Sequence, residues 1–190
     1  MAILPIAIYG NNILRKKSDK IKKSELDDDI KLFIKNLKET AENVECVGLA
    51  APQVGYSLPI FVMIDVQKMA KKIDNDKNNK ERIFKICINP EIVESSKNYI
   101  LSAEGCLSVP GVPVNVYRSC EIKIKYLNEN FEKIEETLTG YESCVFQHEH
   151  DHLNGKLLID HVKKSKISRY KDILKKLEEG KKIDVPYKII

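Results

Sequence analysis

The sequence holds few of the patterns that mark fibrous, membrane-spanning or secreted chains. Its 8 Gly and 7 Pro among 190 residues are too few for a collagen-like or linker-type chain. No apolar run approaches the roughly 20 residues that a transmembrane helix needs, so no membrane partner is expected. The apolar segment 3–8 has no basic stretch before it and no small-residue cleavage site after it, which argues against a signal peptide. We therefore expect a cytoplasmic protein.

Cysteine and net charge are also limited. The five Cys residues are an odd number and lie far apart in the sequence, so without a secretory signal a disulfide framework is not expected. Lys and Arg total 32 against 28 Asp and Glu, a net charge of +4. Because most basic residues are mixed with acids, no specific DNA binding is expected. The hydrophobic fraction of 43% over this length suits one domain, residues 1–190, with a real core.

Apolar residues recur at helical spacing in two segments, 25–43 and 164–179, and a third helix is expected between them. The predicted helices are residues 25–43, 142–153 and 164–179. Ser24 and Asp27 resemble a capping box at the start of the first helix. Asn154-Gly155 and Gly180 are typical of helix C-termini, so they should end the second and third helices.

Short β-like runs lie between the first two helices and predict strands. These runs are residues 59–65, 83–88, 92–93, 99–101, 122–126 and 131–138. Asn89-Pro90 should stop the second run, and the polar segment 127–130 should turn a hairpin between the last two. The polar stretch 67–82 should be a solvated loop. Strands and helices do not alternate regularly, so the predicted class is α+β with largely antiparallel sheet.

The strongest chemical signal lies in the second predicted helix, where His148, Glu149 and His152 form an H-E-x-x-H motif. Residues four apart share one helix face, so both imidazoles can bind one metal ion. Glu149 projects from the neighbouring position, where it can reach a metal-bound water. His150 should point to the far side of the helix, and His161 should be an ordinary polar residue near a helix start.

A catalytic metal usually takes three protein ligands, so two histidines leave the set incomplete. A metallopeptidase of the thermolysin kind would supply a downstream Glu, but the acids on the last predicted helix look like its solvated face. The metzincin continuation after the motif is absent. An upstream alternative is Cys106, which lies between Gly105 and the extended run 107–110. A thiol in such a tight turn can face a cleft, although a buried structural thiol fits this pattern as well.

Three segments together resemble the peptide deformylase family in its bacterial form. G-L-A-A-P-Q at 48–53, E-G-C-L-S at 104–108 and Q-H-E-x-D-H at 147–152 occur once each, in the family's order. The resemblance covers most of the chain, and residues 163–180 correspond to the family's C-terminal helix. It implies one catalytic domain in which antiparallel sheets pack around a central metal-binding H-E-x-x-H helix, with helices near both ends.

The resemblance also implies a cofactor, a substrate and a set of roles. Cys106, His148 and His152 would bind one divalent ion, typically Fe(II), with zinc, nickel or cobalt able to replace it. The substrate would be the N-formylmethionyl end of a nascent polypeptide, which is hydrolysed to formate and a free amine. Glu149 would act as base and then acid. The Gln53 amide and the Leu107 backbone N–H would stabilise the developing oxyanion.

Further residues receive supporting roles from the same resemblance. Glu104 and Arg118 would form an ion pair that braces the Cys106 segment. The methionine side chain would enter an apolar slot lined by Val47, Gly48, Tyr141, Cys144 and Val145.

The chain departs from the family at one position. The family's first motif usually begins with Gly, a hydrophobic residue and a second Gly. Here that stretch is Cys46-Val47-Gly48, so Cys46 replaces the first Gly. We hypothesise that Cys46 narrows the substrate groove or makes the site more prone to oxidation.

Two functions of other classes compete with this interpretation. A metal-dependent endopeptidase would keep the two histidines and Glu149 but take a third ligand other than Cys106. A non-catalytic, metal-stabilised protein would bind RNA or the ribosome through lysines of the C-terminal helix. Those lysines are Lys163, Lys164, Lys166, Lys171, Lys175, Lys176, Lys181 and Lys182. A deformylase acting on nascent chains can also use them for a weak ribosome contact.

Overall fold

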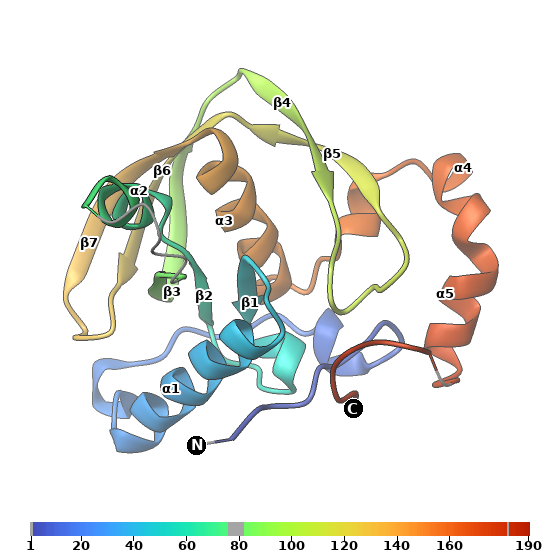
Figure 1. The fold of residues 1–190 in the computed structure, drawn as a ribbon, viewed down its shortest axis with the longest axis horizontal. Coiled ribbons are helices and arrows are strands. Elements are labelled where there is room, and N and C mark those ends of the chain that lie inside the picture. The colour runs from blue at the N-terminus through green and yellow to red at the C-terminus, as the bar shows by residue number, and fades with distance from the viewer. Residues whose placement is uncertain (1, 76–81, 182) are drawn as a thin grey trace.

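The computed structural model describes residues 2–75, 82–181 and 183–190, and within them two antiparallel sheets (Figure 1). The larger sheet has the strand order β1-β2-β3-β6-β7, and the smaller one pairs β4 with β5. The strands are β1 (Gly48–Ala50), β2 (Ile60–Ile64), β3 (Phe84–Ser95), β4 (Tyr99–Glu104), β5 (Val114–Ser119), β6 (Glu121–Leu127) and β7 (Lys133–Thr139). The predicted α+β class with antiparallel sheet is confirmed.

Helix α3 (Gly140–Leu153) is the predicted H-E-x-x-H helix, and it lies between the two sheets (Figure 1). It contacts β1 and β2 on one side and β5 on the other. Phe146 is fully buried and meets the ring of Phe61 from β2 edge-on, with ring centroids 5.1 Å apart. As predicted, the helix ends at Asn154-Gly155, where Gly155 has φ 69°. Packing on both sides therefore fixes the direction in which the motif's side chains point.

Helix α1 (Asp28–Asn43) covers the β1–β2 end of the large sheet with the apolar stripe that the sequence predicts. Its start differs from the prediction, because the N-cap is Asp27 rather than Ser24. The Asp27 carboxylate accepts a hydrogen bond from the Ile30 N–H at 3.0 Å. The preceding residues Lys23–Glu25 form a separate 3-10 turn, so the predicted capping box does not form.

Two predictions for the middle of the chain were wrong. Part of the expected loop 67–82 is helix α2 (Val66–Asn75), because the Asp65 carboxylate caps its start by accepting from the Lys68 N–H at 2.9 Å. Residues 76–81 of that loop lie outside the described residues. Strand β3 does not stop at Asn89-Pro90 but continues through a register shift, where Asn89 has φ 50°. The predicted strand at 92–93 is thus the second half of β3.

The predicted C-terminal helix is also interrupted. It divides into α4 (Lys164–Ile167), a 3-10 turn (Ser168–Tyr170) and α5 (Lys171–Glu178). Leu174 and Leu177 of α5 are buried in one hydrophobic cluster with Leu157 and Leu158. None of the helices in the described part of the chain has the length and apolarity that a membrane crossing demands.

Beyond α5 the chain turns back across the molecule and ends beside the N-terminal segment (Figure 1). Ile189 forms a parallel bridge with Ile6, and the Ile6 N–H donates to the Lys188 carbonyl at 2.7 Å. No element was predicted for this segment.

Candidate metal centre and active site

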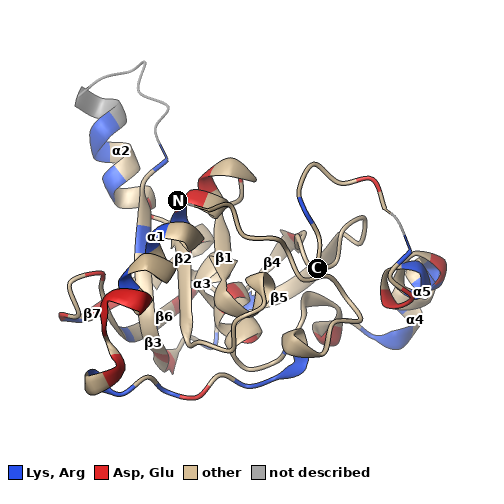
Figure 2. Ribbon diagram, turned by 90° about the horizontal axis from the view of Figure 1, so that it is seen from below, with Lys and Arg blue, Asp and Glu red and all other residues tan. Residues whose placement is uncertain are grey.

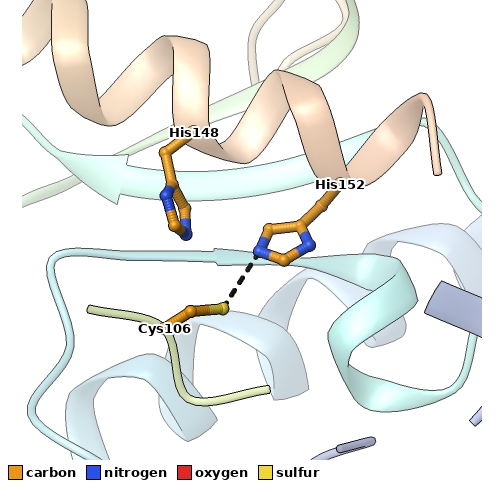
Figure 3. Close-up of side chains that lie close together, drawn as sticks. All are labelled: Cys106, His148 and His152. Carbon is orange, nitrogen blue, oxygen red and sulfur yellow. Dashed lines mark hydrogen bonds between the residues drawn. The ribbon is translucent and has the colours of Figure 1, made fainter. Parts of the chain in front are cut away.

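Three predicted metal ligands converge where α3 faces the turn that follows β4 (Figure 3). The ligand atoms of Cys106, His148 and His152 all lie within 4.8 Å of one another. The Cys106 sulfur is 3.3 Å from His152 Nε2. Around a tetrahedral ion, a thiolate sulfur and an imidazole nitrogen lie about 3.6 Å apart. The spacing of this donor set therefore fits a divalent ion.

The protonation of these groups suits the same interpretation. Burial alone would raise the pKa of the Cys106 thiol, but the charges and hydrogen bonds of His152 and His148 outweigh it and hold that pKa well below its usual range. A thiolate is the form of cysteine that binds metal. Sulfur with two imidazoles is a donor set that suits iron or zinc.

A buried network of charged side chains holds one ring nitrogen of His148. Nδ1 of His148 lies 2.9 Å from Glu104 Oε2, which leaves Nε2 for the metal. Arg118 donates two hydrogen bonds to Glu104, at 2.8 and 2.9 Å, and one to Asp151 at 2.5 Å. His161 Nε2 lies 2.7 Å from the same Asp151 oxygen. Such outer contacts fix the orientation of a metal-binding imidazole.

The electrostatics of this network follow from burial and pairing. Burial would raise the pKa of Glu104, but hydrogen bonds from Arg118 and His148 outweigh it and lower that pKa to about 2. Burial would likewise raise the pKa of Asp151, which His161 and Arg118 lower to about 2. Both carboxylates are therefore charged at neutral pH. The predicted pair of Glu104 and Arg118 is present, and Asp151 and His161, which were not predicted to take part, extend it.

Glu149 is buried beside Cys106, His148 and His152, which we call the ligand cluster. One of its carboxylate oxygens, Oε2, has no hydrogen-bond partner among the described residues, and neither has the Nδ1 of His152. Burial raises the pKa of Glu149 to about 7, against the opposing charges of His148 and His152. A carboxyl group with such a pKa can accept and return a proton near neutral pH.

The position of the Glu149 carboxyl explains why residue 48, at the start of β1, is a glycine. A Cβ built there would lie 2.4 Å from Glu149 Oε1 and 2.8 Å from its Cδ. The absence of a side chain therefore gives the Glu149 carboxyl its space. Gly48 shapes the position of Glu149 as well as the wall of the pocket.

Gln53 approaches the Cys106 sulfur from the 3-10 turn Ala51–Val54. Its side-chain oxygen accepts from the Ala50 N–H at 2.8 Å, and its amide nitrogen lies 3.5 Å from the Cys106 sulfur. Gln53 is only 2% exposed. The first bond fixes the amide orientation, so that the N–H donors face the ligand cluster.

A pocket of about 520 Å³ opens over this cluster. All five residues expected to form the methionine slot line it, namely Val47, Gly48, Tyr141, Cys144 and Val145. Cys144 and Val145 are buried, whereas Val47 and Tyr141 are exposed. The slot thus has an apolar floor and an open rim.

Cys46 also lines the pocket, at the position where the family usually has glycine. Its sulfur lies 3.6 Å from the Ala41 carbonyl. Burial, together with the charge of Glu149, raises the pKa of the Cys46 thiol to about 12. A protonated thiol reacts slowly with oxidants, so the structure favours the narrowed groove over oxidation as the effect of Cys46.

Sequence reasoning missed one wall of the pocket, which Val185, Pro186 and Tyr187 of the C-terminal segment form. The available signal was an apolar or aromatic residue at every second position, namely Ile183, Val185, Tyr187 and Ile189, since this spacing is typical of a half-buried extended segment. His150 faces away from the ligand cluster as predicted, but it is half-buried and stacks on Phe146, with ring centroids 6.2 Å apart.

Comparisons with known proteins place the chain in a family. A model of the polypeptide deformylase family matches residues 3–168. The peptide deformylase of Christiangramia forsetii is 39% identical over 98% of this chain and 95% of its own length. The crystal structure of peptide deformylase from Thermotoga maritima is 40% identical, with a TM-score of 0.73 over 86% of this chain and 99% of its own.

A further solved structure carries a bound peptide. The class I type b peptide deformylase from Acinetobacter baumannii, with Met-Ala-Ser bound, is 30% identical, with a TM-score of 0.74 over 85% of this chain and 99% of its own. The chain described here therefore belongs to the polypeptide deformylase family, whose members are metal-dependent hydrolases that remove the N-formyl group from the formylmethionine of newly made polypeptides and release formate.

Proposed function

We propose that Cys106, His148 and His152 bind one divalent ion and that this ion is Fe(II) or Zn(II), with nickel or cobalt able to replace it. The mutual spacing of the three ligand atoms, all within 4.8 Å, is the observation that carries the proposal. When bound, the ion would supply Lewis-acid chemistry and lower the pKa of a coordinated water toward neutrality. The same proposal treats residues 1–190 as one catalytic unit.

Glu149 is the proton carrier in this proposal. Its unpartnered Oε2 would accept the proton of the attacking water and later deliver it to the leaving amine of the substrate. The raised pKa supports both steps, because a group that titrates near 7 can exist in either form at neutral pH. Gly48 leaves the space that this carboxyl needs.

Gln53 and Leu107 are the proposed donors to the formyl oxygen as it becomes negatively charged. The fixed Gln53 amide faces the Cys106 sulfur, and the Leu107 N–H follows Cys106 directly in the chain. Donors that are oriented in advance stabilise a transition state without reorganisation, and the loss of one costs about 3 kcal/mol. Gln53 and Leu107 line the same pocket as Cys106 and His148.

The substrate side of the proposal concerns the N-formylmethionyl end of a nascent peptide. The methionine side chain would enter the slot of Val47, Gly48, Tyr141, Cys144 and Val145, whose apolar floor suits a thioether. Formylated chains arise at the ribosome, so we place the enzyme in the cytoplasm.

A ribosome contact through the C-terminal helix would be weak. Figure 2 shows basic and acidic residues interleaved on α5. Lys175 and Lys181 both lie near Glu179, at 3.9 and 2.6 Å. These pairs reduce the positive charge that α5 presents to RNA, and Lys182 lies outside the described residues.

The test is formate release from a formyl-Met peptide by anaerobically purified protein, with metal analysis of the same sample. The parent protein should release one formate per peptide and hold one ion per chain. Glu149→Ala should abolish release and keep the ion, because Glu149 is not a ligand. Glu135→Ala is the matched control, since Glu135 is exposed on β7 and its ion pair among the described residues is with Lys125, at 3.4 Å. Turnover by Glu149→Ala at the parent's rate would contradict the proposal.

A further inference from the structure

The C-terminal segment 183–190 reaches the active-site pocket from outside the region that the family model matches. That match ends at residue 168. Within the segment, Ile183, Val185, Tyr187 and Ile189 are half-buried, whereas the residues between them are exposed. This alternation is typical of an extended segment with one face packed on the protein. The segment is therefore seated on the molecule along its length.

Backbone contacts at the end of the chain hold this segment in place. The Ile6 N–H donates to the Lys188 carbonyl at 2.7 Å, and the Ile190 N–H donates to the Ile6 carbonyl at 3.0 Å. Ile190 also lies against Gly55, where an added Cβ would come within 2.9 Å of Ile190 Cδ1. Two hydrogen bonds and close packing thus anchor the residues immediately after Tyr187.

Tyr187 joins the segment to the turn that carries the metal ligand. Its hydroxyl donates a hydrogen bond of 2.8 Å to the carbonyl of Leu107. Burial and the charge of Cys106 raise the pKa of Tyr187 to about 12, so the hydroxyl keeps its proton. The Leu107 carbonyl and the Leu107 N–H belong to the same residue, and restraint of one restrains the other. Tyr187 thereby acts on the residue that would donate to the formyl oxygen.

Val185 and Pro186 line the same pocket as Tyr187 and Leu107. They carry no charge or hydrogen-bonding side chain. The methionine slot residues Tyr141, Cys144 and Val145 belong to α3, a different element, so this wall is available to another part of the peptide. Its surface suits an apolar contact with the residues that follow the formylmethionine.

We propose that the C-terminal segment is a working part of the active site, in which Tyr187 is a positioning residue for Leu107 and Val185 and Pro186 contact the peptide beyond its first residue. This proposal rests on the proposed function of the pocket. It assigns a specificity role to residues that the family model does not cover.

The peptide contact can be tested by fluorescence, because the chain contains no Trp. Pro186→Trp places a single fluorophore on the wall, and Asp184→Trp places one on an exposed position of the same segment that does not line the pocket. The tripeptide Met-Ala-Ser has no formyl group and is not turned over. Met-Ala-Ser should shift the Trp emission of Pro186→Trp in a saturable way, over the concentrations at which it inhibits deformylation. It should leave the Trp emission of Asp184→Trp unchanged. Unshifted emission of Pro186→Trp under inhibition would overturn the contact.

The positioning role can be tested with Tyr187→Phe, which removes only the hydroxyl. A neutral hydrogen bond contributes about 0.5–1.5 kcal/mol, so kcat should fall about two- to tenfold. Tyr170→Phe is the matched control, since the Tyr170 hydroxyl donates a 2.8 Å hydrogen bond to the Pro113 carbonyl outside the pocket. That control should keep the parent's kcat and KM.

Binding of Met-Ala-Ser to the same samples separates positioning from loss of folded protein. Tyr187→Phe should keep the tripeptide's Kd and one site per chain, because the product lacks the formyl oxygen. An unchanged kcat, or a fall in kcat matched by a fall in binding sites, would overturn the positioning role. If the parent itself released no formate, the proposed function would fail, while a saturable emission shift of Pro186→Trp that Asp184→Trp lacks would still show the peptide contact with the wall.

Discussion

Replacement of Arg118 by Met is predicted to destabilise the protein far more than a surface arginine replacement does. The Arg118 side chain is 4% exposed, and its carboxylate partners Glu104 and Asp151 are 8% and 15% exposed. Removal of one partner leaves the other charges buried without compensation, which costs about 3–5 kcal/mol. If the free energy of unfolding falls by about 2 kcal/mol per M urea, the urea concentration at the unfolding midpoint should fall by about 2 M.

The measurement is urea unfolding of the parent and two variants at pH 7 and at lower pH. Arg15→Met is the matched control, because the Arg15–Asp160 pair has the same 2.5 Å separation but side chains 42% and 38% exposed. It should cost at most about 1 kcal/mol. The pKa values of Glu104 and Asp151 are lowered to about 2 in the folded protein, so their contribution is present above the unfolded values near 4 and is lost as pH falls toward 2. Equal losses in both variants at pH 7 would refute the reasoning.

Three further substitutions test separate parts of the site. Gly48→Ala should displace the Glu149 carboxyl, because the new Cβ would lie 2.4 Å from Oε1; deformylation should fall at least tenfold while metal content stays at one ion per chain. Cys46→Gly should widen the groove and change KM for formyl peptides, with peroxide sensitivity like the parent's; unchanged KM would end the hypothesis that Cys46 narrows it. Cys106→Ser should lose the ion or change metal preference, whereas an endopeptidase with another third ligand would keep it.

The placement of the candidate site residues was predictable in part, because some of it is local. The i, i+4 spacing of His148 and His152 requires only a helix, and the helix predicted over 142–153 is present as α3. The proposed third ligand could not be predicted from local spacing, since Cys106 lies on a turn after β4 and reaches the histidines only through the tertiary fold. Residue patterns alone left it open, and the family resemblance identified it. The structure then placed its sulfur 3.3 Å from His152 Nε2.

The errors in the fold prediction share a physical cause, which is that side chains or packing overrode local preference. Asp65 caps a helix in a segment whose polar composition favoured a loop. Asn89-Pro90 continues a strand through a shift of register, because neighbouring strands supply the pairing on either side. His161 was predicted to be an ordinary polar residue, but it contacts Asp151 across ten residues of sequence. Such contacts depend on how elements meet, and composition does not encode them.

The central claim is that one sulfur and two imidazoles bind a common cation. X-ray absorption spectroscopy of the anaerobically purified protein tests it directly at the metal edge. We expect one sulfur at about 2.3 Å and two nitrogens at about 2.0–2.1 Å from the ion, and loss of the sulfur in Cys106→Ser. A parent spectrum without sulfur, fitted by nitrogen and oxygen ligands alone, would contradict the claim.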